Sequence, residues 1–477
     1  MRFLTIVWFI IFSNSLQARP FGIGFRSFAV DDVWHANRIL PDFKPQPPHR
    51  RIWVSLWYPT PILDGKMKHA DYFEATDPFD KEYLAVYQRF RNAIIYQEVA
   101  QISQLMPIPQ NPWPSQPTAF QRLTGATRDA PFADGKFPVI IYHTGSQGGF
   151  EENAPLFEAL AQQGYCIFTV IAPDANGNID HTRRSPELQL ADAILVSEKL
   201  RLDPHLNFSQ VVLMGYSAGA QSSLHAALRG FGTRALILLD TTMENIAKMK
   251  IEFALLEELQ NASGSFTTPI LAFAAIDHEG KKDRFDIYRN TPHSPKVLVD
   301  FGRDGEHNDF MWHGIVEREL RQPVDEAGLS LAKQRYAFIQ KTVIAYLEQA
   351  LKPVPDWNAL RPIFQEATSI VSYTSLPKDV SPPIPDLDLI FGLRFMGESA
   401  RALELCHSVQ PNQLPDILLC TAVALENQNI EQAEIFMKAY RRANRGKAKG
   451  FFDAVQKAEA DELEKLIKAA RGPLKKP

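Results

Sequence analysis

Residues 211–219 read Val-Val-Leu-Met-Gly-Tyr-Ser-Ala-Gly, an apolar run followed by a serine with a glycine two positions away on each side. The run predicts a buried strand, and the residues from Gly219 onward predict a helix. In so sharp a strand-to-helix turn, a side chain at either glycine would clash, and the strain leaves the serine oxygen projecting from the turn. The motif in this context predicts that Ser217 is a nucleophile.

Strands and helices alternate on both sides of this turn. Short apolar runs predict strands at 137–142, 166–171, 211–214, 235–239, 270–274 and 296–301. Helical patterns lie between or after them, at 154–163, 188–201, 219–228, 242–258 and 330–351. This alternation predicts βαβ units and an α/β fold, with a mainly parallel sheet covered by helices. Residues 51–59 alternate like a half-buried strand and predict an antiparallel strand at the edge of that sheet.

A serine hydroxyl is a weak nucleophile and needs a base that is held by an acid. The loop after the last predicted strand contains His307, which is the predicted base, and His313 is the reserve candidate. Two aspartates follow predicted strands, Asp240 after 235–239 and Asp277 after 270–274. Either strand end can present a carboxylate to the histidine, so the residues alone leave the acid open.

The chain also resembles a known family. The Gly-x-Ser-x-Gly motif, the Leu-Asp pair at 239–240 and His-Asn-Asp-Phe at 307–310 resemble the platelet-activating-factor acetylhydrolase and dienelactone-hydrolase-like branch of the α/β-hydrolases. The resemblance covers roughly residues 50–350, including the early strand at 54–59. It implies the α/β-hydrolase fold and places the acid on the Leu-Asp pair, favouring Asp240 over Asp277. It also implies cleavage of esters with short or oxidised, lipid-like acyl chains.

An oxyanion hole requires two backbone N–H groups aimed at the developing negative charge. Ala218, directly after the nucleophile, is the first predicted donor. The second is expected in the loop 143–149, His-Thr-Gly-Ser-Gln-Gly-Gly, which follows the strand at 137–142. Family members commonly have Ser-His-Gly and then an apolar residue there. Aligning the glycine puts Ser146 in the donor position, and the departure from the motif leaves Gly145 as the alternative. Tyr216 stands where many members have His, at a position that varies across the wider fold.

The first residues resemble a secretory signal peptide. Arg2 precedes an apolar run at 3–12, and small residues such as Ser15 and Ala18 follow. The run is shorter than the roughly 20 apolar residues that span a bilayer, and no later segment has a transmembrane pattern. The pattern predicts export of a secreted or periplasmic protein. Three cysteines provide no disulfide framework: Cys166 is a core candidate, and whether Cys406 and Cys420 pair is left open.

A chain of 477 residues predicts more than one domain. The predicted parts are a signal peptide at 1–18, a catalytic domain at 19–352, a Pro-rich linker at 353–385 and a small all-helical domain at 386–477. Residues 62–136 are predicted to be an insertion in the catalytic domain, acting either as a lid or as packing. The last domain contains helical hairpins with turns near 397–398 and 427–429, weakly resembling tetratricopeptide units. The alternative is a plain helical appendage packed on the catalytic domain.

The composition argues against several other functions. A formal net charge of −4, from 51 basic and 55 acidic residues, gives no electrostatic case for nucleic-acid binding. The polar cluster Asp277-His278-Glu279 lacks metal-ligand spacing, and the sequence has no phosphate loop or dinucleotide motif. We therefore expect neither a metal nor another cofactor.

Two functional hypotheses follow. The first is a serine ester hydrolase that acts on a small-molecule or lipid ester, with peripheral membrane contact. The second is an exported interaction protein with a catalytically inactive hydrolase core, whose C-terminal helices bind a protein partner. A separation of more than about 5 Å between His307 and Ser217 would favour the second hypothesis.

Overall fold

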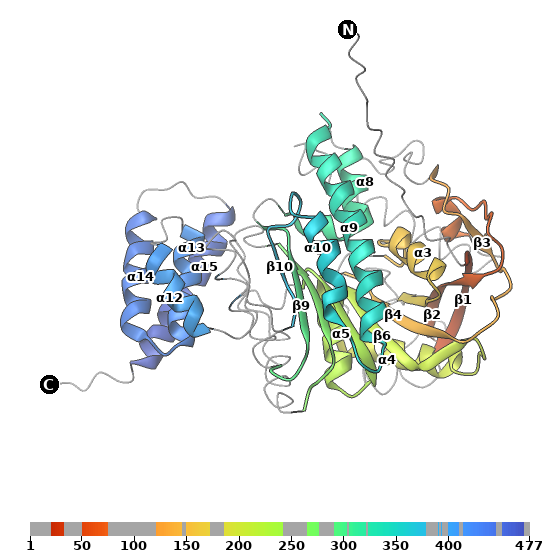
Figure 1. The fold of residues 1–477 in the computed structure, drawn as a ribbon, viewed down its shortest axis with the longest axis horizontal. Coiled ribbons are helices and arrows are strands. Elements are labelled where there is room, and N and C mark those ends of the chain that lie inside the picture. The colour runs from red at the N-terminus through yellow and green to blue at the C-terminus, as the bar shows by residue number, and fades with distance from the viewer. Residues whose placement is uncertain are drawn as a thin grey trace, which may run out of the picture.

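The structure is a computed structural model. It describes residues 21–32, 50–74, 121–145, 149–171, 186–241, 265–275, 291–302, 305–320, 323–377, 399–409, 414–444 and 451–471, together with Ile390 and Leu393. The predicted signal peptide, residues 75–120 of the predicted insertion, the predicted helix at 242–258 and Asp277 lie outside these residues. Within the described ranges the chain forms one large sheet with helices on both faces and a second group of helices (Figure 1).

The sheet has ten strands in the order β10-β9-β8-β7-β6-β4-β5-β2-β1-β3. The strands from β5 to β9 along this order are parallel to one another. β2 lies antiparallel between β5 and β1, and β10 lies antiparallel beside β9. The strand bounds are β1 Gly22–Asp32, β2 Arg50–Thr60, β3 Ala126–Arg128, β4 Phe137–His143, β5 Cys166–Ile171, β6 Leu206–Tyr216, β7 Thr233–Leu239, β8 Ile270–Ala274, β9 Lys296–Asp300 and β10 Tyr373–Ser375.

Both faces of the central strands are buried, because helices cover each face. Side chains alternate along a strand, so Val212 of β6 faces one core and Leu213 faces the other. The helices α3 (Ala154–Gln162), α8 (Trp312–Leu320) and α9 (Glu326–Ala350) pack against the first face. The helices α4 (Pro186–Leu200) and α5 (Ala218–Leu228) pack against the second. This strand order, with its antiparallel second strand and covered parallel centre, is the α/β-hydrolase fold, as the sequence predicts.

The sheet domain extends beyond its predicted end at residue 352. After α9 the chain forms η7 (Trp357–Leu360), α10 (Arg361–Glu366) and β10, which pairs with β9. Leu360, Phe364 and Leu376 are buried in the same core as α9. The prediction of a linker over 353–385 is therefore wrong as far as residue 377. Its prolines are compatible with structure, since Pro362 lies in the first turn of α10, where a missing N–H costs nothing.

The predicted insertion at 62–136 also contributes to the sheet domain. Its early part includes the short helix η1 (His69–Phe73), which packs into the same core as α3. Its last part contains β3, which pairs with β1 in parallel. The backbone at Lys68 bridges to Leu123, so the two ends of the segment lie together. Residues 62–74 and 121–136 are thus packed parts of the domain, and the lid question concerns residues outside the described ranges.

The C-terminal helices enclose a core of their own (Figure 1). They are α12 (Ser399–Val409), α13 (Leu414–Glu426), α14 (Ile430–Ala443) and α15 (Phe451–Ala470). A disulfide joins Cys406 to Cys420, the pairing that the sequence leaves open. The predicted turn at 427–429 separates α13 from α14, and the Asn429 side chain caps α14 by accepting a hydrogen bond from the Gln432 N–H at 3.1 Å. The similarity to tetratricopeptide units stays a prediction. In the described part of the chain, no helix has the length and apolarity to cross a membrane.

Candidate active site

Ser217 lies in the turn between β6 and α5, with a backbone φ of 53°. This left-handed conformation costs a serine about 1–3 kcal/mol and persists only where the surroundings enforce it. The flanking glycines are part of that enforcement. A Cβ on Gly215 would lie 2.2 Å from the Gly219 carbonyl oxygen, and one on Gly219 would lie 2.0 Å from that of His143. The predicted strand-to-helix turn is present, and only glycine fits at either flank.

The ends of neighbouring strands are tied together at this turn. The Ser217 N–H donates to the Leu239 carbonyl of β7 at 3.0 Å. One strand further, the Asp240 N–H donates to the Phe273 carbonyl of β8 at 2.9 Å. Asp240 also has a left-handed φ, 44°. Ser217 and Asp240 are therefore each fixed, in an unusual backbone conformation, at the same end of adjacent parallel strands.

His307 lies between these two side chains, at the start of η6 (His307–Phe310) in the loop that follows β9. Its Nε2 is 2.9 Å from Ser217 Oγ, and its Nδ1 is 2.5 Å from Asp240 Oδ2. The other Asp240 oxygen accepts a hydrogen bond from the Ala275 N–H at 3.4 Å. The His307 side chain is 23% exposed and that of Asp240 is 10% exposed, so solvent screens the pair only partly. An acid, a base and a hydroxyl joined in this order can pass a proton from serine to histidine.

Buried ion pairs hold the loop that carries His307. The Asp309 carboxylate, which is almost fully buried, pairs with Arg318 of α8 at 2.6 Å and with Arg335 of α9 at 2.9 Å. Arg318 also pairs with Glu306 at 2.8 Å. Charged groups buried in this way are favourable only when they are paired and hydrogen-bonded. Two helices thus fix residues on both sides of His307 in the chain.

The reserve base does not join this group. His313 Nε2 lies 3.6 Å from Glu151 Oε1, and both side chains are buried. The alternative acid, Asp277, lies outside the described residues. Among the residues that are described, no three His, Cys, Asp or Glu side chains are placed to hold a metal ion.

The three candidate oxyanion donors differ in whether the structure describes them and in whether their N–H is already hydrogen-bonded. Ala218 is the first residue of α5, so its N–H belongs to the first turn, where helical N–H groups have no carbonyl partner within the helix. Ser146 is outside the described residues. The N–H of the alternative, Gly145, donates to Glu152 Oε1 at 3.1 Å and is therefore already engaged. The structure thus argues against Gly145 as the second donor.

A buried polar group behind this loop was missed by the sequence analysis. Glu152 Oε1 also accepts a hydrogen bond from the Tyr142 hydroxyl at 2.6 Å. Burial, followed by the Glu152 carboxylate, raises the pKa of Tyr142 well above its usual value, so the hydroxyl stays a donor. The neighbouring Asn153 accepts from the Trp312 N–H at 3.1 Å and from the Tyr336 hydroxyl at 3.0 Å. The polar run at 151–153 looks like a solvated loop in the sequence, and no pattern there signals its burial.

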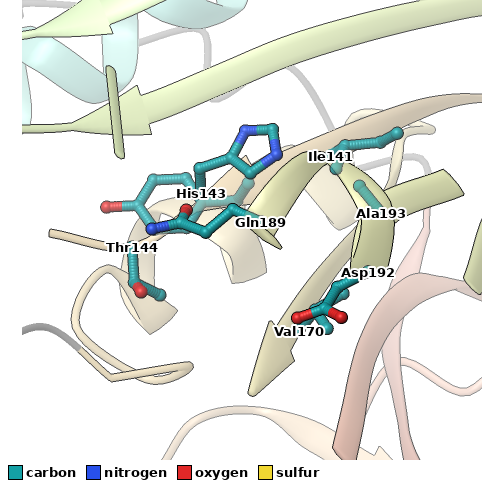
Figure 2. A pocket seen from close by; sticks show the side chains of 8 residues that line it. Ile141, His143, Thr144, Val170, Gln189, Asp192 and Ala193 are labelled. Carbon is teal, nitrogen blue, oxygen red and sulfur yellow. The ribbon is translucent and has the colours of Figure 1, made fainter. Parts of the chain in front are cut away.

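A small cavity lies among the last residues of β4, β5 and the helix α4 (Figure 2). It encloses about 10 Å³, room for about one water molecule, and its lining includes His143, Thr144, Gln189 and Asp192. His143 Nδ1 is 2.8 Å from the Ser223 hydroxyl of α5. This contact joins the end of β4 to the helix that follows Ser217. The cavity is too small for an ester substrate.

Comparisons with known proteins give little beyond this geometry. No protein-family model matches the chain, and no curated protein matches it. Among solved structures, it is similar to a ferulic acid esterase from Streptomyces cinnamoneus, with 16% identity and a TM-score of 0.46. The match covers 70% of this chain and 92% of the esterase. A similarity this low says nothing about activity, and the fold assignment rests on the strand order and the Ser217 turn.

Proposed function

We propose that the protein is a serine ester hydrolase in which Ser217 is the nucleophile, His307 the general base and Asp240 the acid that orients the base. One observation carries the proposal: Ser217 Oγ, the His307 imidazole and the Asp240 carboxylate form a continuous hydrogen-bonded chain, with distances of 2.9 and 2.5 Å. The strained turn that presents Ser217 supports it independently.

The reaction follows from the order of these groups. Ser217 Oγ attacks the acyl carbon of the ester while His307 Nε2 takes the hydroxyl proton. Asp240 keeps the other imidazole proton on Nδ1 and stabilises the imidazolium that forms. The tetrahedral intermediate collapses, the C–O bond to the alcohol breaks, and His307 returns its proton to the leaving oxygen. A water molecule then repeats the sequence on the acyl-enzyme and releases the acid and free Ser217.

The negative charge on the intermediate requires two N–H donors. The Ala218 N–H is the first, because it lies next to the nucleophile at the start of α5. Ser146 N–H remains the proposed second donor, since the Gly145 N–H is bound to Glu152.

The proposed substrates are esters with short or oxidised acyl chains, including lipid-like ones. This proposal rests on the resemblance to acetylhydrolase-like and dienelactone-hydrolase-like enzymes. We also propose that the protein is exported, that it contacts membranes peripherally, and that its C-terminal helices bind a protein partner. The alternative of an inactive core gains no support. It would be favoured by more than about 5 Å between His307 and Ser217, whereas His307 Nε2 lies 2.9 Å from Ser217 Oγ.

Labelling with a fluorophosphonate probe tests the proposal directly, because the probe forms a bond only with an activated serine. We compare the purified protein with Ser217→Ala and with Ser209→Ala, a control that removes an exposed hydroxyl hydrogen-bonded to Asn207. The expected result is labelling of the wild type and of Ser209→Ala, and none of Ser217→Ala. Labelling that persists in Ser217→Ala, or a folded wild type that does not label, contradicts the proposal. A series of nitrophenyl esters then measures the preferred acyl length.

A further inference from the structure

Tyr216, the last residue of β6, contacts His307 of the proposed triad on the face of the sheet covered by α3, α8 and α9. Its side chain is buried, with the residue 4% exposed. The phenol ring stacks on the His307 imidazole, with 4.8 Å between ring centroids and 30° between the planes. The residue directly before the proposed nucleophile therefore packs against the proposed base.

The hydroxyl of Tyr216 reaches the backbone of the same loop. It lies 3.1 Å from the His307 carbonyl oxygen and 3.1 Å from Asn308 Oδ1, and it can donate its proton to either. The Asn308 amide in turn donates to Glu317 Oε2 at 2.8 Å. Glu317 is fully buried on α8, so this chain of contacts ends in a fixed part of the core.

On its other side the ring contacts the loop that follows β4. A Cβ on Gly145 would lie 2.9 Å from Tyr216 Cδ1, so the glycine backbone lies directly against the ring. Any larger residue at position 145 would have to displace Tyr216. The Gly145 N–H is itself held by Glu152. Tyr216 thus lies between His307 and the loop proposed to carry the second oxyanion donor.

We propose that Tyr216 is a positioning residue for the proposed ester hydrolysis, a role that rests on that proposed function. Asp240 fixes only one nitrogen of the His307 ring, and the ring can still tilt about that contact. The stacked phenol limits the tilt and keeps Nε2 pointed at Ser217 Oγ, while its hydroxyl fixes the backbone of the loop. A position that varies across the wider fold therefore controls, in this chain, the geometry of the proton transfer.

The size of the effect follows from the two contacts. Tyr216→Leu removes the stack and the hydroxyl, and a displacement of about 1 Å at reacting groups can lower the rate about 100-fold. Tyr216→Phe keeps the stack and loses one ordinary hydrogen bond, so we expect a decrease of only about 3- to 10-fold. Both changes should appear in kcat and in the rate of fluorophosphonate labelling. KM should stay the same, because the ring is not proposed to bind substrate.

Tyr58→Phe is the matched control. The buried Tyr58 hydroxyl donates to the Ala130 carbonyl at 2.6 Å. Tyr58 lies on β2, an interior strand between β5 and β1 that contributes no residue to the proposed triad. Like Tyr216→Phe, Tyr58→Phe removes one buried tyrosine hydrogen bond. It should lower the free energy of unfolding without changing the labelling rate. Thermal unfolding of every variant shows whether it is folded at the assay temperature.

The outcomes separate this inference from the proposed function. The positioning role is supported if the wild type labels, Tyr216→Leu labels much more slowly, and Tyr216→Phe labels at a rate between the two. Folded Tyr216 variants that label at the wild-type rate overturn it while leaving the esterase proposal intact. If the wild type does not label, the proposed function fails. The mobility of the His307 ring, measured by NMR on ¹³C-labelled histidine, then decides the geometric part: unchanged mobility in Tyr216→Leu overturns it too.

Discussion

Asp240→Asn tests the proposed triad most sharply, because it changes charge and hydrogen-bonding character with almost no change in shape. The carboxylate oxygen now accepts the Nδ1 proton of His307 at 2.5 Å. An amide nitrogen in that place donates to Nδ1 and so favours the tautomer with its proton on Nε2. That proton would point at Ser217 Oγ, and the histidine would no longer accept the proton of serine.

The expected loss has two parts. Two opposite unit charges about 4 Å apart interact by about 4 kcal/mol at an effective dielectric constant near 20. Because the His307 side chain is 23% exposed, we reduce this to about 3 kcal/mol, or roughly a 100-fold decrease in rate. Restoring the useful tautomer costs roughly another 1–2 kcal/mol by the same order-of-magnitude reasoning, for a total decrease of about 10³- to 10⁴-fold. The corresponding substitution in another Ser-His-Asp enzyme costs about 10⁴-fold.

The assay is steady-state hydrolysis of nitrophenyl acetate, with Ser217→Ala giving the background rate. Asp277→Asn is the matched comparison, because the residues alone left Asp240 and Asp277 as alternative acids. We expect kcat to fall steeply in Asp240→Asn, with little change in KM, and to stay within about threefold of the wild type in Asp277→Asn. A folded Asp240→Asn that retains more than a tenth of kcat, or a steep loss in Asp277→Asn alone, refutes the assignment of Asp240.

Three further predictions concern stability. Gly219→Ala places a Cβ 2.0 Å from the His143 carbonyl oxygen, so its free energy of unfolding should fall by about 3 kcal/mol or more in urea titrations. Burial lowers the pKa of Lys296 from 10.5 to about 8, so the unfolded chain binds more protons between these values and stability rises with pH there. The shift corresponds to roughly 3 kcal/mol at pH 7, and the lost hydrogen bond from Lys296 Nζ to the Thr291 carbonyl offsets about 1 kcal/mol of it. Lys296→Met should therefore stabilise the protein by about 2 kcal/mol at pH 7, a gain that disappears as the pH rises toward 10.5. Arg122→Met leaves the buried Glu158 carboxylate without its ion pair at 2.7 Å and should cost about 2–3 kcal/mol. Burial raises the pKa of Glu158 and the guanidinium lowers it, so the cost should be larger at pH 8 than at pH 5 and should shrink in Arg122→Met/Glu158→Met.

The central sheet could be predicted because its strands carry their own signal. Each interior strand is a short run that must be apolar on both faces, as at 211–214 and 235–239. The edge strands lack this signal. β3 and β10 have three residues each, too few to show a period, and they are strands only because a neighbour offers free hydrogen-bonding groups. Because no strand pattern is visible at β10, the prolines around it predicted a linker.

The site was predictable in part for a similar reason. Ser217 has a local motif, and His307 has a position in the order of strands, so both could be chosen from the sequence. The contacts of Asp240 depend on a backbone turn that no local pattern distinguishes from the one expected at Asp277. Glu152 and Asn153 are polar residues that become buried only because α8 and α9 close over them. Burial of this kind is decided by tertiary packing, which leaves no mark in the local sequence.

The strained backbone at two strand ends has a common geometric reason. Tyr216 and Leu239 end β6 and β7 as neighbours, and both face the core covered by α8. In an extended strand the next side chain would point to the opposite face. His307 stacks on Tyr216 on the α8 face, so Ser217 and Asp240 must leave the extended conformation to reach it, and both have positive φ. The strained backbone conformation of Ser217 and Asp240 persists because the N–H of each residue is hydrogen-bonded to the next strand. The same strain that opposes folding at these two residues therefore brings their side chains to one imidazole.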